Sequence, residues 1–86
     1  MARPVRVDVD TSAMSDADAD VWLRRLRLRL FPTAPESPIG RRLLAARAEL
    51  DRITARGQAR GARPATIAAE ARLLLDEHGV RELLVP

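Results

Sequence analysis

Few side chains of this chain could carry catalytic or metal chemistry. His78 is the single histidine, and there is no cysteine. A zinc site needs several histidine or cysteine ligands, and a catalytic nucleophile needs a base within reach. Asp76 and Glu77 precede His78, but adjacent residues on a helix point in different directions. We therefore interpret His78 as a cation at the carboxyl end of a helix, and we predict no enzyme activity, no metal site and no cofactor.

Three aspartates, Asp16, Asp18 and Asp20, have the alternating spacing of the first ligands of a calcium loop. Such a loop also needs glycine at its sixth position and a bidentate glutamate at its twelfth, where this chain has Val21 and Arg27. The aspartates are better explained as acidic residues at the start of a helix, where the helix dipole favours negative charge.

The arginine cluster at residues 24–29 is the strongest candidate for function. All 15 basic residues are arginine, and most lie in residues 21–63, between two acidic ends. The planar guanidinium is well suited to phosphates, but on a helix these arginines point around most of the circumference. One hypothesis makes them charged separators between apolar stripes, paired with the protein's own aspartates. Under the alternative, nucleic-acid binding, the candidate residues are Arg24, Arg25, Arg27, Arg29, Arg60 and Arg63.

The segment that positions this cluster is predicted to be a helix from Ser15 to about residue 31. Ser15 is a good N-cap, and Pro32 and Pro35 end the element. One apolar stripe lies on one side of this helix and a second on nearly the opposite side. The first contains Ala19, Trp22, Leu23, Leu26 and Leu30, and the second contains Ala17, Val21, Leu28 and Phe31. So short a chain can hardly cover both stripes, which favours a partner subunit.

A strand remains the alternative for residues 25–31, because arginine and leucine alternate strictly there. An earlier strand is predicted at residues 4–10, where Val5, Val7 and Val9 alternate with charged residues.

Two further helices are predicted. Ser37 and Pro38 begin the first, which runs to about Arg56 before Gly57 and carries a narrow apolar seam. That seam consists of Ile39, Leu43, Ala46, Leu50 and Ile53. A basic connection at residues 57–63 leads to the last helix, which starts near Pro64 and ends at Gly79. Its buried stripe is predicted to contain Ile67, Ala71, Leu74 and Leu75.

Residues 80–86 fit either an edge strand or an extra helical turn, and the pattern does not decide between them. The predicted fold is thus mainly α, with an N-terminal strand followed by three helices in a single small domain over residues 1–86. It becomes α+β if residues 25–31 form a strand. No segment approaches the roughly 20 apolar residues of a membrane span, and the start lacks the apolar core of a signal peptide, so we expect a cytoplasmic protein. The use of arginine for all 15 basic residues, together with the many alanines and leucines, is typical of a GC-rich genome, so we expect a bacterial or phage protein, with a virion component as a further option.

The order strand, helix, helix over residues 4–56 resembles the ribbon-helix-helix repressors and antitoxins. The resemblance implies two copies that pair their first strands and lay the polar face of the strands in the major groove of DNA. Here that face would carry Arg6, Asp8 and Asp10, and the two acids depart from what a phosphate-lined groove requires. A small dimeric DNA-binding regulator or antitoxin is therefore the alternative hypothesis.

The leading hypothesis is a non-catalytic assembly or adaptor protein, such as a small subunit, an inhibitor or a phage-type structural component. It would oligomerise or dock on a larger protein. Buried aromatic side chains with arginine beside them are typical of binding hot spots. We expect Trp22, Leu28 and Phe31 to be apolar anchors, with Arg25 and Arg29 as a charged rim.

Overall fold

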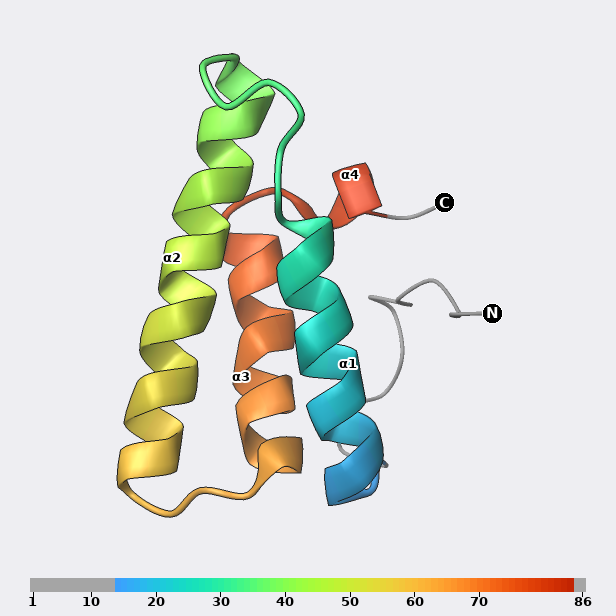
Figure 1. Cartoon of the computed structure of the whole chain (residues 1–86), viewed down its shortest axis with the longest axis vertical. Coiled ribbons are helices and arrows are strands. Elements are labelled where there is room, and N and C mark those ends of the chain that lie inside the picture. The colour runs from blue at the N-terminus through green and yellow to red at the C-terminus, as the bar shows by residue number, and fades with distance from the viewer. Residues whose placement is uncertain (1–13, 85–86) are drawn as a thin grey trace.

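The computed structural model describes residues 14–84, and these residues form four α-helices (Figure 1). They are α1 (Asp16–Arg29), α2 (Pro38–Ala59), α3 (Pro64–Glu77) and α4 (Arg81–Leu84). The prediction of a mainly α fold is confirmed for this part of the chain. The strand predicted at residues 4–10 lies outside the described residues and stays a prediction.

Helix α1 begins as its sequence predicts. The side-chain oxygen of Ser15 accepts a hydrogen bond from the backbone N–H of Asp18 at 3.1 Å. Acidic residues occupy the first turn and arginines the last, so both ends complement the helix dipole. The helix continues to Arg29, which confirms the helical interpretation of this segment and shows the strand alternative to be wrong. The helix is favoured over the strand because it places Leu26 and Leu30 on the same side, where both side chains are fully buried.

Helix α2 also begins at its predicted cap, because Ser37 accepts a hydrogen bond from the N–H of Gly40 at 2.9 Å. Its predicted end at Arg56 was wrong, since the helix passes through Gly57 and continues to Ala59. A Cβ atom at position 57 would lie 2.6 Å from Cγ1 of Ile67, so this glycine lets α2 and α3 approach closely. The chain turns instead at Gly61, where φ is +73°.

Helix α3 ends in the predicted glycine cap. Gly79 has a φ of +63°, and its N–H donates to the carbonyl oxygen of Asp76 at 3.1 Å. The N–H of Val80 donates to the carbonyl oxygen of Leu75, also at 3.1 Å, which completes a Schellman motif. The chain then forms α4, so residues 81–84 take the helical turn and not the edge strand.

Helix α3 lies at the centre of the fold, and α1 and α2 each pack against it (Figure 1). The predicted first stripe of α1 is buried at every position, as is the predicted stripe of α3. On α2 the seam holds from Leu43 onward, but Ile39 is 52 % exposed, contrary to the prediction. The first turn of α2 extends past the ends of α1 and α3, so no helix covers Ile39 there (Figure 1).

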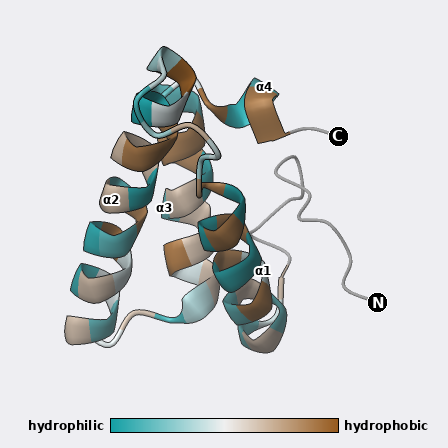
Figure 2. Cartoon of the chain, turned by 45° about the horizontal axis from the view of Figure 1, so that its top comes forward, coloured by the Kyte–Doolittle hydropathy of each residue, from teal (hydrophilic) through white to brown (hydrophobic). Residues whose placement is uncertain are grey.

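In the view of Figure 2, hydrophobic and hydrophilic segments alternate along α1. Within residues 14–84, every helix is too short or too polar to cross a membrane.

Candidate protein-interaction surface

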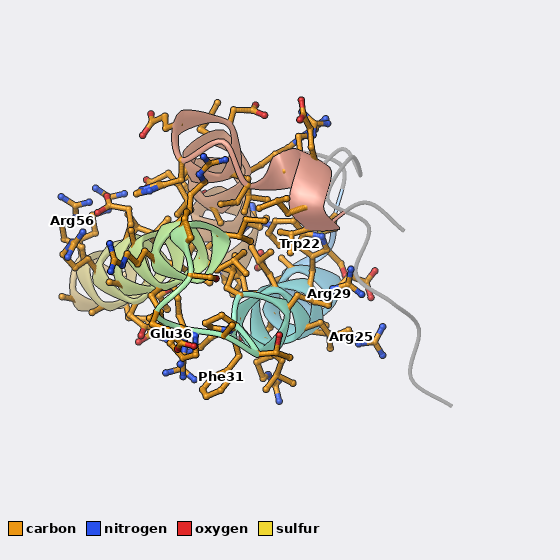
Figure 3. The ribbon with its side chains drawn as sticks, turned by 90° about the horizontal axis from the view of Figure 1, so that it is seen from above. Trp22, Arg25, Arg29, Phe31, Glu36 and Arg56 are labelled. Atoms are coloured by element: carbon orange, nitrogen blue, oxygen red, sulfur yellow. The ribbon has the colours of Figure 1, made fainter. Side chains whose placement is uncertain are left out.

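Trp22, predicted to be an anchor for a partner, is part of the protein's own core. Its side chain is 5 % exposed and belongs to the same buried cluster as Ala19 and Leu26. Viewed from above, Trp22 points inward from α1 (Figure 3). The helical period explains this position, because residues 19, 22 and 26 share the side of α1 that packs on α3. In a single copy of the chain, therefore, Trp22 is not available to a partner.

The second apolar stripe of α1 has the opposite environment. Leu28 is 74 % exposed, Phe31 63 % and Val21 42 %, and Ala17 is exposed as well. We call the line formed by Ala17, Val21, Arg24 and Leu28 the α1 outer face. The residues of the α1 outer face lie on the side of α1 away from α3, and none of the described helices buries them.

Phe31, just beyond the end of α1, is held in place by a residue of α2. The guanidinium carbon of Arg47 lies 5.0 Å from the centre of the Phe31 ring, a cation–π contact. The Nε atom of Arg47 is buried and has no hydrogen-bond partner among residues 14–84. The phenyl ring thus contacts α2 on one side but is largely uncovered. Sequence reasoning did not find Arg47, because only the tertiary structure brings α2 beside this ring.

Most of the predicted nucleic-acid-binding arginines form ion pairs with carboxylates of the same chain. The shortest nitrogen–oxygen distances are 2.6 Å for Arg24–Asp20, 2.8 Å for Arg27–Asp51, 2.6 Å for Arg60–Glu70 and 3.1 Å for Arg63–Asp16. Two nitrogens of Arg27 donate to the two oxygens of Asp51, and this hydrogen bonding raises the pKa of Arg27. These pairs reduce the positive charge that the cluster presents to phosphates.

The two predicted rim residues differ in their surroundings. Arg29 donates a hydrogen bond of 2.8 Å from Nη2 to the carbonyl oxygen of Leu84, and so fastens α4 to α1. Arg25 forms no ion pair within residues 14–84, and its side chain points away from the helices (Figure 3). Of these two guanidinium groups, that of Arg25 is therefore the one without a hydrogen-bond or ion-pair partner among residues 14–84.

A groove of about 430 Å³ lies between α1, α2 and the start of α3. Its lining includes Leu23, Leu50 and Ile67, which are already buried by the chain's own packing. The ion pair of Arg27 and Asp51 joins α1 and α2 across it. Because little apolar surface remains open there, the groove is a weaker candidate for binding than the α1 outer face.

The described residues contain no cluster of three or more side chains that could hold a metal ion. His78 is partly buried at the C-cap of α3, the position predicted for it. Its backbone N–H donates a hydrogen bond to the carbonyl oxygen of Leu74 at 2.9 Å. Comparison with known protein families, curated proteins and solved structures found no match.

Proposed function

We propose that this chain is a non-catalytic protein-interaction module that associates through the α1 outer face together with Phe31. One observation carries the proposal. The largest exposed apolar side chains of α1 and its carboxyl end, Leu28 and Phe31, are separated by only two residues, while the core on the other side of α1 is complete. Monomeric proteins seldom leave large apolar side chains adjacent on one face unless that face meets another surface.

The chemistry around these two side chains also supports association. Phe31 already contacts the guanidinium of Arg47, so a partner that covers the ring buries an aromatic side chain with a cation beside it. Arg25 lies on the same outer side of α1 and is available as a charged neighbour. Apolar anchors with arginine beside them are the usual composition of a binding hot spot. Relative to the sequence-based hypothesis, Val21 takes the place of Trp22 among the anchors.

The proposal is tested by replacing Leu28 and Phe31 together with glutamine. The matched control is Leu73→Gln on α3, because Leu73 is 63 % exposed, the same fraction as Phe31. Burying a leucine or phenylalanine side chain is worth about 1.5–3 kcal/mol, so losing two anchors should weaken association by at least tenfold. The full chain carrying an affinity tag is incubated with lysate of its native cells, and each complex is measured by its sedimented mass and by its protein composition.

We expect the wild type and the Leu73→Gln variant to sediment above the monomer mass, and the double variant to sediment as a folded monomer. Circular dichroism confirms folding in each case. Equal association by the wild type and both variants, or a monomer for the wild type under all conditions, would contradict the proposal.

A further inference from the structure

The residues of the α1 outer face have the spacing of a helix-pairing seam. Ala17, Val21, Arg24 and Leu28 follow one another at intervals of four, three and four residues. This is the a and d pattern by which one helix packs along another. In the described structure the seam has no partner, since Val21 is 42 % and Leu28 74 % exposed. Arg24 is compatible with an apolar seam for two reasons. Its Nη2 atom lies 2.6 Å from Oδ2 of Asp20, which compensates its charge, and its aliphatic stem can cover apolar surface.

Charges flank this seam in an ordered way. On one flank lie Asp18 near the start of α1 and Arg25 in its second half, at the e positions of the heptad. Neither residue forms an ion pair within residues 14–84. On the other flank, at g positions, lie Asp20 and Arg27. Both flanks are therefore acidic toward the amino end of α1 and basic toward its carboxyl end.

This distribution is complementary to itself when the helix is reversed. We infer that the occupant of the α1 outer face is a second copy of this chain, with the two α1 helices antiparallel around a twofold axis near residues 22 and 23. The inference rests on the proposed function and specifies its partner. In antiparallel helix pairs, e positions face e positions and g positions face g positions, so acidic and basic residues of the two copies meet on both flanks.

The spacing also defines the register. With the axis near residues 22 and 23, Leu28 of each copy packs on Ala17 of the other, and Val21 packs on the stem of Arg24. Asp18 of each copy then faces Arg25 of the other, and the symmetry makes this contact occur twice. Asp18 and Arg25 are the two flanking charges that form no ion pair within residues 14–84.

A parallel arrangement would not bring Asp18 and Arg25 together. In parallel helix pairs e positions face g positions, so Arg25 would meet Asp20 of the other copy, an acid that already pairs with Arg24, and the two helix dipoles would be aligned side by side. Only the antiparallel orientation therefore joins the two flanking charges that form no ion pair within residues 14–84. A chain of 86 residues without cysteine also has a small core and no disulfide, so a second subunit supplies burial that the single copy lacks.

The contact is small, because α1 has only 14 residues. Interfaces below about 1,200 Å² are typical of weak complexes. We therefore expect a reversible dimer that forms at micromolar or higher concentrations and weakens as salt screens the flanking pairs.

The experiment is sedimentation equilibrium of the full chain from about 10 μM to 1 mM, at low and at high salt, a range suited to weak interfaces. The charge-reversal variants Asp18→Arg and Arg25→Asp are measured alone and as an equimolar mixture. Each variant alone places like charges across the contact, and we expect its dimer to be at least tenfold weaker than that of the wild type. In the mixture the reversed side chains face opposite charges again, so dimers containing one copy of each variant should recover.

Arg56→Asp on the exposed surface of α2 is the matched control for a reversal of charge, and it should leave the dimer unchanged. Circular dichroism verifies that every variant is folded. A wild type that stays monomeric up to about 1 mM, beyond the range of weak interfaces, would overturn the inference. Reversals that leave the dimer constant unaltered, or a mixture that fails to recover, would do so as well.

The experiments distinguish a failure of the second-copy inference from a failure of the proposed function. If the wild type is monomeric but a different protein is retained by it and lost from the Leu28 and Phe31 double variant, the interaction function stands and the second copy is wrong. If neither a second copy nor another protein binds, both fail.

Discussion

Replacing Gly40 with alanine will destabilise the protein, although alanine is the better helix former. A Cβ atom at position 40 would lie 1.9 Å from the carbonyl oxygen of Ala34 and 2.9 Å from Cα of Pro35. Both are backbone atoms, so no side-chain rotation relieves the overlap, and the turn between α1 and α2 must move. Alanine gains at most about 1 kcal/mol of helix propensity over glycine.

The cost exceeds that gain because the turn is held by bonds that depend on its position. The carbonyl oxygen of Ala34 accepts hydrogen bonds from Ser37 Oγ at 2.7 Å and from the N–H of Ser37 at 3.1 Å. Ser37 Oγ also caps α2 by accepting the N–H of Gly40. Losing the cap costs about 1 kcal/mol and each hydrogen bond about 1 kcal/mol, which leaves a net loss of about 1–2 kcal/mol.

The assay is urea unfolding followed by the fluorescence of Trp22, the single tryptophan and a core residue. We expect a lower midpoint with an unchanged slope, and a thermal midpoint that falls by about 5–15 °C. The control is Ala45→Gly on the exposed surface of α2, which should lose only the propensity difference of about 1 kcal/mol. A Gly40→Ala variant as stable as the wild type, or more stable, would refute the packing argument for this turn.

Three further predictions concern the core, the charges and the alternative function. Trp22→Ala should lower the free energy of unfolding by about 3–5 kcal/mol, measured by circular dichroism, because it empties a buried site. Arg52 donates a hydrogen bond to Glu49, which lowers the pKa of this carboxyl in the folded protein. The pair therefore stabilises the folded state at pH values above the pKa that Glu49 has in the unfolded chain, and this stability is lost as the pH falls through the folded pKa. In acid titrations of the free energy of unfolding, Glu49→Gln should therefore show a weaker dependence on pH. In a salt-titrated assay with duplex DNA we expect no retention at low salt, since most of the arginines proposed for DNA contact form intramolecular ion pairs. Tight retention that falls steeply with salt would favour the regulator hypothesis instead.

Local signals predicted the helices well where they act within a few residues. The Ser15 and Ser37 caps and the Gly79 end depend on hydrogen bonds between near neighbours, and all three are confirmed. Gly57 shows where such signals fail. A glycine near the end of an apolar seam indicates a helix end, but here it is required because Ile67 of another helix lies against it.

The candidate site was predicted in part for the same reason. The two stripes of α1 follow from its sequence and the helical period, and both exist as predicted. Which stripe faces the core is not a local property, so Trp22 was predicted to be an anchor for a partner although it belongs to the protein's own buried core. The contact between Phe31 and Arg47 likewise joins residues of different elements.

The amino-acid sequence by itself determined that residues 16–29 form a helix with an apolar stripe on each side and an acidic-to-basic gradient along its length. Capping, proline positions and periodicity are all encoded within a few turns. Only the tertiary structure decided that α3 buries the stripe of Trp22 and leaves Leu28 and Phe31 exposed. That choice depends on which faces of three helices fill one core together, and such packing is a property of the whole fold that no single segment encodes.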